Sequence, residues 1–211
     1  VAITDKETDY RIEAANRFLA KPISRADVVW TFAGVRPLYD DGKSDPSSIT
    51  RDYTFELDEE GGKAPVLSVY GGKLTTYRCL AESALDKLAP FLPPLGPKWT
   101  KESYLPGGDM SNYNAFRDEM FDRYKGFPRD LLDGVVRRHG SRAPLLLGDI
   151  QKPEQLGRNF GAGLTEREIE SFIADEWAET AEDILWRRTK CGLHMDAAQR
   201  QAVEDYLASR K

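Results

Sequence analysis

The segment best suited to chemistry is a diglycine turn followed by a lysine, Gly71-Gly72-Lys73, at the end of an apolar stretch. The pattern predicts a strand that runs into the glycines and a helix that begins at Lys73. Such a turn exposes unpaired N–H groups at the positive end of the helix dipole, which attract an anion or an electron-rich carbonyl. The glycines let a ligand approach the backbone, and Lys73 adds a positive charge. A tight strand-to-helix turn with no ligand explains the same pattern equally well.

Other catalytic and cofactor motifs are missing from the sequence. The turn lacks the GxxxxGK[ST] spacing of a phosphate-binding loop, and no GxGxxG dinucleotide fingerprint occurs anywhere in the chain. There is no Ser/His/Asp spacing, no HExxH and no metal-ligand cluster, so we expect no metal site. We interpret both histidines as structural: His139 ends a predicted helix, where a cation is favourable, and His194 follows Gly192 in a loop.

Two arginines occur where a positive charge needs a partner. Arg36 lies near the end of an apolar stretch between Gly34 and Pro37, and Arg51 begins a predicted strand. A guanidinium in such surroundings is costly unless it binds a phosphate, a carboxylate or an acidic side chain. The sequence leaves both choices open, because aspartates lie close to each arginine in the chain.

The composition is that of a soluble globular protein. The 211 residues are 40% hydrophobic and 31% charged, with a net charge of −5. The negative balance argues against a nucleic-acid partner, and no apolar stretch approaches the roughly 20 residues of a membrane span. Two distant cysteines fit a reduced, cytoplasmic setting. We see no signal peptide, and a first residue other than Met leaves open that the chain is part of a longer protein.

The first half is expected to mix helices and strands. The predicted elements are a helix over Lys6–Leu19 capped by Thr4 or Asp5, a strand over Asp27–Tyr39, a hairpin of Asp52–Leu57 and Ala64–Tyr70, and a helix over Lys73–Leu88. The hairpin feeds directly into the diglycine turn, so the candidate site lies where a strand passes into a helix.

The second half is expected to be helical. The predicted helices are Met110–Tyr124, Pro128–His139, Thr165–Trp177, Ala181–Thr189, and a last one capped by Asp196 that ends near Ser209. A Thr180–Asp183 capping box and an Asp183–Arg187 ion pair are also expected. A stretch rich in Pro and Gly separates the halves. We therefore predict an α+β chain with an oxidoreductase part over residues 1–95, a linker over 96–108 and a helical domain over 109–211.

Four separated segments together resemble one family, the FAD-dependent, quinone-reducing glycerol-3-phosphate dehydrogenases. The segments are TFAGVRPL (residues 31–38), SITRDY (48–53), APVLSVYGGKLTTYR (64–78) and AEDILWRRTKCGL (181–193). The resemblance covers nearly the whole chain but only the C-terminal part of the family's length, without the GxGxxG half that holds the family's active-site histidine. Cys191 stands where the family pattern has Leu, a change that affects no site residue.

The resemblance implies oxidation of sn-glycerol 3-phosphate to dihydroxyacetone phosphate, with hydride passing to FAD and electrons to quinone at the inner face of the cell membrane. In that pattern Arg36 matches the arginine that holds the substrate phosphate, and Arg51 matches a second active-site arginine. Lys73 matches a lysine near substrate and flavin. The turn that contacts the flavin ring matches Gly71, Gly72, Leu74 and Thr75.

The same resemblance implies limits for the chain on its own. We expect it to be inactive and to bind no FAD tightly, because the adenine and pyrophosphate site is missing. A glycerol-3-phosphate oxidase, which uses oxygen as electron acceptor, is the alternative within the same chemistry. Another alternative is that the part from about Gly108 to Lys211 is an interaction or dimerisation module, with a homodimer as a possible assembly, or only a stable structural domain.

Overall fold

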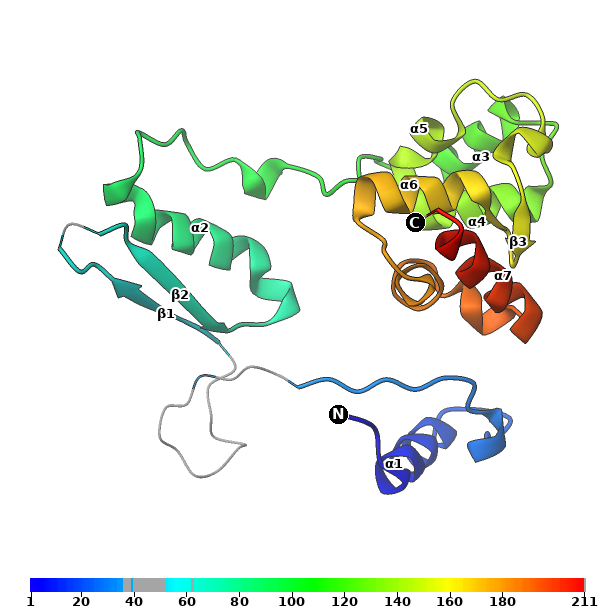
Figure 1. Cartoon of the computed structure of the whole chain (residues 1–211), viewed down its shortest axis with the longest axis horizontal. Coiled ribbons are helices and arrows are strands. Elements are labelled where there is room, and N and C mark those ends of the chain that lie inside the picture. The colour runs from blue at the N-terminus through cyan, green and yellow to red at the C-terminus, as the bar shows by residue number, and fades with distance from the viewer. Residues whose placement is uncertain (36–38, 40–51, 62, 211) are drawn as a thin grey trace. The chain divides into compact units, whose positions relative to one another are not determined.

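The computed structural model describes residues 1–35, 39, 52–61 and 63–210 (Figure 1). The chain divides into two compact units, Val1–Ser103 and Tyr104–Lys211. It is rich in helices and has two small sheets of two strands each among the described residues. Within the same residues, no helix is long and apolar enough to cross a membrane.

The first helix, α1 (Asp5–Asn16), begins at a capping box. The Thr4 hydroxyl accepts a hydrogen bond from the Glu7 N–H at 3.3 Å, and the Glu7 carboxylate accepts one from the Thr4 N–H at 2.8 Å. Of the two predicted caps, Thr4 is therefore the one used. The helix ends earlier than predicted because the Asn16 amide bonds the backbone N–H and C=O of Ile23, which turns the chain back.

The strand predicted over Asp27–Tyr39 is wrong for its described residues. Arg25–Asp27 forms one turn of 3-10 helix, and residues 28–35 and 39 have no regular structure. Val29 is 68% exposed and Phe32 75% exposed. β-branched and aromatic residues favour a strand only where a neighbouring strand supplies hydrogen bonds, and neither described sheet includes this segment.

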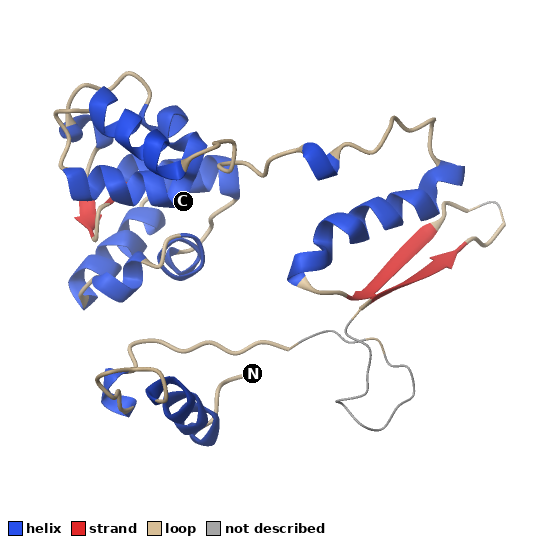
Figure 2. Cartoon of the chain, turned by 180° about the vertical axis from the view of Figure 1, so that it is seen from behind, coloured by secondary structure: helices blue, strands red, loops and turns tan. Residues whose placement is uncertain are grey.

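The predicted hairpin and the helix after it are confirmed. Strands β1 (Tyr53–Asp58) and β2 (Val66–Gly71) pair antiparallel, from Tyr53 opposite Gly71 to Asp58 opposite Val66. Helix α2 (Tyr77–Leu88) lies along this ribbon (Figures 1 and 2), and the Tyr53 hydroxyl lies 3.3 Å from the Ser83 hydroxyl. The α-helix begins later than predicted, because Leu74–Thr76 form a 3-10 turn first.

In the described part of the chain, buried apolar side chains are confined to the second unit. Among the described residues, none before Met120 is a buried apolar residue, and α2 contains no buried residue at all. Burial of apolar surface is the main stabilising contribution to folding. The first unit therefore has local hydrogen bonds and partly covered faces, but no sealed interior among its described residues.

The second unit is a bundle of short helices with a small hairpin. Its elements are α3 (Tyr113–Arg123), α4 (Arg129–His139), α5 (Ala143–Leu147), β3 (Asn159–Gly161), β4 (Leu164–Thr165), α6 (Glu166–Glu176), a π-helical segment (Asp183–Arg188) and α7 (Ala197–Ala208). The helices predicted from the sequence are thus present, with ends shifted by a few residues. The segment predicted as Ala181–Thr189 is wound as a π-helix instead of an α-helix.

Local contacts that the sequence predicted are present in this unit. The Thr180 hydroxyl accepts a hydrogen bond from the Asp183 N–H at 3.2 Å, and Asp183 accepts one from the Thr180 N–H at 2.9 Å. Asp183 also pairs with Arg187 at 3.0 Å. The Asp196 carboxylate caps α7 by accepting a hydrogen bond from the Gln199 N–H at 2.8 Å.

Two apolar clusters form the core of the second unit, one built mainly from α3, α4 and α5 and the other from α6, the π-helical segment and α7. A buried polar contact joins them. Glu168 on α6 has no exposed surface and accepts hydrogen bonds from Arg138 and His139 at the end of α4. Burial acts to raise the pKa of Glu168, but the hydrogen bonds from His139 and Arg138 outweigh it and hold the pKa below its ordinary value.

Candidate functional site

The candidate site within the described residues is the turn from β2 to α2. Gly71 and Gly72 both have left-handed backbone angles, with φ of 72° and 96°. A side chain at Gly72 would also place its Cβ 3.1 Å from Leu80 Cδ1. Glycine is therefore required here by backbone conformation first and by the close approach of α2 second.

Hydrogen bonds in this turn leave two donors without an acceptor in the described part of the chain. The Lys73 N–H donates to the Thr76 hydroxyl at 3.2 Å, and the Thr76 hydroxyl donates to the Lys73 C=O at 3.0 Å. The N–H groups of Leu74 and Thr75 have no acceptor among the described residues. Two adjacent free N–H groups at the start of a helical segment can bind an anion or a polarised carbonyl oxygen.

The side chains of the turn are exposed. Lys73 and Thr75 are exposed, and Leu74 is 90% exposed although it is apolar. Lys73 makes no ion pair with a carboxylate of the described residues. Because its charge is not neutralised from within the described part of the chain, Lys73 can serve a ligand with negative charge or an electron-rich edge.

The predicted site residues fall into two groups. Gly71, Gly72, Lys73, Leu74 and Thr75 form this one turn. The two arginines, Arg36 and Arg51, lie outside the described residues, so their placement relative to the turn is a prediction. Tyr53, which begins β1, pairs with Gly71, which ends β2. The chain therefore enters β1 at the end of the hairpin where the turn begins.

Two features of the described residues were not predicted from the sequence. One is the Thr76 hydroxyl that closes the turn on Lys73; a threonine three residues after the start of a helix was an available signal. The other is the buried contact of Glu168 with Arg138 and His139. His139 lies 2.8 Å from Glu168 and its ring stacks on Phe172 at 5.3 Å, which agrees with a structural interpretation of this histidine.

Comparison with known proteins gives relatives along nearly the whole chain. It is 46% identical to D-erythritol 1-phosphate dehydrogenase of Brucella abortus over 98% of the chain and 41% of that protein. It is 45% identical to glycerol-3-phosphate dehydrogenase of Pseudomonas aeruginosa over 99% of the chain and 41% of the relative. It is also 45% identical to aerobic glycerol-3-phosphate dehydrogenase of Escherichia coli over 98% of the chain and 42% of the relative. The chain thus spans about two fifths of these relatives.

The resemblance inferred from the sequence motifs is therefore confirmed by close relatives of the expected kind. In addition, residues 98–208 match the family model described as the C-terminal domain of alpha-glycerophosphate oxidase. This match covers more than half of the chain and nearly all of its second unit. The chain belongs to the family defined by the C-terminal domain of alpha-glycerophosphate oxidase.

Proposed function

We propose that the chain is the C-terminal part of an FAD-dependent dehydrogenase that oxidises sn-glycerol 3-phosphate to dihydroxyacetone phosphate and passes the electrons to quinone. The observation that supports this most directly is the turn at Gly71–Thr75, where two N–H groups and the Lys73 ammonium have no partner among the described residues. The relatives named glycerol-3-phosphate dehydrogenases share almost the full length of the chain. The turn lies where β2 passes into α2, and its N–H groups and lysine suit the electron-rich edge of a flavin ring.

The residues of the turn fit such a ring. Gly72 is exposed, so its backbone is accessible to a flat ring from the solvent side. When bound, FAD supplies the acceptor for the hydride that leaves C2 of the substrate. The N–H groups of Leu74 and Thr75, with the Lys73 ammonium, would hold the electron-rich pyrimidine edge of the ring and would stabilise negative charge there. Lys73 is thus a catalytic residue in this proposal.

Arg36 and Arg51 supply the substrate contacts. A guanidinium binds a phosphate group through two parallel hydrogen bonds, each worth about 1.5–3 kcal/mol when charge-assisted. In this proposal Arg36 holds the phosphate and so orients the remote end of the substrate. Arg51, two residues before the start of β1, holds the reacting end near Lys73.

The names of the relatives leave a second substrate to be distinguished. D-Erythritol 1-phosphate is also a polyol phosphate, and the Brucella abortus relative named for it is 46% identical to the chain. Both substrates offer the same phosphate to Arg36, so that contact does not discriminate between them. The description of the matching family as an oxidase also favours testing oxygen as electron acceptor beside quinone.

The test uses the full-length protein that carries this chain. We expect higher kcat/KM for sn-glycerol 3-phosphate than for D-erythritol 1-phosphate, and reduction of a soluble quinone without stoichiometric peroxide. A higher kcat/KM for D-erythritol 1-phosphate would instead identify this four-carbon polyol phosphate as the substrate. Peroxide formation that matches substrate oxidation would instead identify an oxidase.

Variants of the same protein test the residue roles. Arg36→Ala should raise KM for the phosphorylated substrate and leave FAD content unchanged, whereas Lys73→Met should lower kcat. The matched control is Lys98→Met, which removes an exposed lysine that pairs with Asp86 at 2.7 Å. If Lys73→Met and Lys98→Met have equal kcat, Lys73 has no role in the chemistry.

We expect the isolated chain to have no dehydrogenase activity, because the residues that would bind the adenine and pyrophosphate of FAD are not in it. The purified chain should be colourless, and flavin absorbance that survives gel filtration would contradict this.

We also propose that the parent protein is peripheral on the inner face of the cell membrane. Membrane fractionation with a salt wash tests that location, and light scattering of the chain tests a homodimer formed by its helical part.

A further inference from the structure

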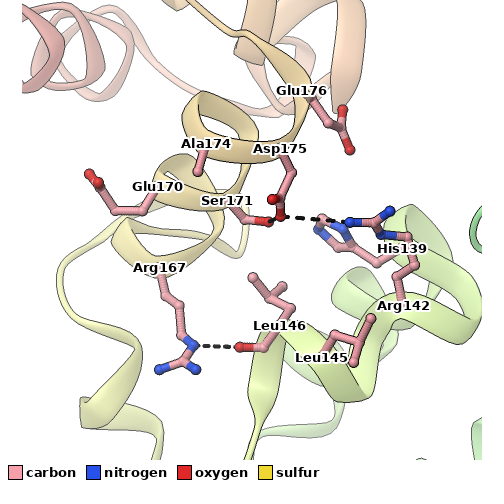
Figure 3. Close-up of a pocket in the computed structure, with 10 residues that line it drawn as sticks. All are labelled: His139, Arg142, Leu145, Leu146, Arg167, Glu170, Ser171, Ala174, Asp175 and Glu176. Carbon is pink, nitrogen blue, oxygen red and sulfur yellow. Dashed lines mark hydrogen bonds and ion pairs between the residues drawn. The ribbon is translucent and has the colours of Figure 1, made fainter.

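A cavity of about 300 Å³ opens in the second unit, between α6 and the junction of α4 with α5 (Figure 3). Two arginines line it, Arg142 from the 3-10 turn after α4 and Arg167 from α6, together with the imidazole of His139. The cavity lies in a different unit from the diglycine turn and shares no residue with it.

The acidic side chains around the cavity are already matched by cations. These pairs are Glu170 with Arg210 at 2.6 Å, Asp175 with Arg142 at 3.6 Å, and Glu176 with Arg188 at 3.5 Å. Glu168, behind His139, is matched by Arg138. Glu170 and Glu176 are thus neutralised by arginines that do not themselves line the cavity, whereas the only arginine beside Asp175 in the described residues is Arg142, which does line it.

Two cations remain available to a ligand. Arg167 donates through Nε to the Leu146 C=O and makes no ion pair with a carboxylate of the described residues. Arg142 lies 3.6 Å from Asp175, which is longer than a hydrogen bond, and Asp175 has a second partner in the Ser171 hydroxyl at 3.1 Å. An oxyanion in the cavity can therefore share the Arg142 guanidinium with Asp175, which keeps its hydrogen bond from Ser171.

His139 adds a buried polar group at the wall of the cavity. Its side chain is 6% exposed and its Nε2 lies 2.8 Å from Glu168. Its Nδ1 has no hydrogen-bond partner among the described residues. Because His139 lines the cavity, its ring signal reports on a ligand that binds there.

We propose that this cavity binds a small molecule with an oxyanion group, a phosphate monoester or a carboxylate, through Arg142 and Arg167 beside His139. The volume suits a small metabolite, since ligand pockets begin at about 300 Å³. Apolar contact is available as well, because the side chains of Leu145 and Leu146 line the space between the two arginines (Figure 3). Nothing in this assignment depends on the redox chemistry proposed for the diglycine turn.

The two histidines of the chain make the site directly observable. The full chain, labelled at histidine with carbon-13, gives one ring signal from His139 and one from the exposed His194, assigned with His194→Gln. Inorganic phosphate and malonate are titrated separately at constant ionic strength, with chloride as the background anion. Saturable movement of the His139 signal, with His194 unmoved, is the expected result; the stronger of the two probes identifies the ligand class.

Variants decide whether the arginines hold the anion. Arg142→Gln and Arg167→Gln should each weaken binding about 10-fold or more, as loss of a charge-assisted hydrogen bond requires. Arg167→Lys should retain part of the affinity, which separates lost charge from lost structure. Arg187→Gln is the matched control, because Arg187 is an exposed cation paired with Glu182 and Asp183 away from the cavity.

Other outcomes would overturn the proposal. Equal, linear shifts of both histidine signals would mean general screening by salt and no site. Unchanged affinity in both glutamine variants would remove the arginines from it. Lys73→Met should leave the His139 titration unaltered; its loss in that variant would mean that the anion binds at the diglycine turn instead.

Discussion

Glu168 on α6 and Arg138 on α4 meet through two hydrogen bonds, 2.6 Å from Nε to Oε1 and 2.9 Å from Nη2 to Oε2. Glu168 has no exposed surface and the Arg138 side chain is 14% exposed. The pair connects α4, which contributes to one apolar cluster of the helical unit, with α6, which contributes to the other.

Glu168→Gln should lower the free energy of unfolding of the helical unit by about 3–5 kcal/mol. The reason is that Arg138 would remain buried without its counter-charge, which costs more than the intact pair contributes. Urea denaturation followed by circular dichroism measures the effect. Glu179→Gln, at an exposed position, should change the same quantity by less than about 0.5 kcal/mol. Equal effects of the two variants would show that the buried pair contributes no more to the free energy of unfolding than an exposed carboxylate does.

The stability of the folded chain should depend on pH through the Asp183 carboxylate. Hydrogen bonds from Thr180, then from the backbone of Thr180 and Glu179, lower the pKa of Asp183 to about 2, against its ordinary 3.8. A lowered pKa means that the folded state favours the carboxylate, so the stabilisation is present above pH about 4 and is lost as the pH falls toward about 2. Asp183→Asn should therefore lower Tm at neutral pH, and the difference should vanish near pH 2.

Thermal unfolding of wild type and Asp183→Asn from pH about 6 to about 2 measures this difference. Asp109→Asn is the control, because Asp109 is exposed and has no hydrogen bond or ion pair among the described residues. A Tm difference for Asp183→Asn that stays constant over the whole range would contradict the role given to the carboxylate charge.

Gly72→Ala should loosen the ribbon of β1 and β2. A φ of 96° is strained for alanine, and the new Cβ would lie 3.1 Å from Leu80 Cδ1, where α2 packs on the turn. If the substitution lowers the free energy of opening the ribbon by more than about 1 kcal/mol, backbone amide hydrogen exchange should be at least about 5-fold faster in both strands. Gly61→Ala is the matched control in the same hairpin, since its Cβ would meet no atom within 4 Å. Equal exchange rates would mean that the turn tolerates a side chain.

Residues 104–211 should fold without the first unit. All apolar side chains that are buried among the described residues lie in this part, from Met120 to Leu207. A separately expressed 104–211 segment should show one cooperative thermal transition, whereas residues 1–103 should lose helix signal gradually. Cooperative unfolding of residues 1–103 alone would show that a core forms there after all.

The parts of the fold that the sequence predicted are those set by nearby residues. Thr4 and Asp196 cap the helices that follow them, and the hairpin of β1 and β2 is set by two apolar strands around a polar turn. The diglycine turn was predicted for the same reason, because Gly71 and Gly72 are required by local backbone conformation.

The parts that were not predicted depend on distant residues. Glu168 is 30 positions from Arg138, so no short pattern connects them. The apolar stretch before Gly34 has strand composition, but a strand also needs a partner, and the described sheets supply none. For Arg36 and Arg51 the sequence gives the residue type and the family resemblance, and their geometry stays a prediction.

The ribbon of β1 and β2 has a consequence for how the chain associates with other polypeptides. Because the described sheet contains only these two strands, each has an outer edge whose N–H and C=O groups have no ladder partner among the described residues. Such an edge templates the addition of a further strand, and Val66 and Val69, which are 58% and 45% exposed, would be covered in the process. At high concentration, the isolated chain is therefore prone to edge-to-edge aggregation through this hairpin.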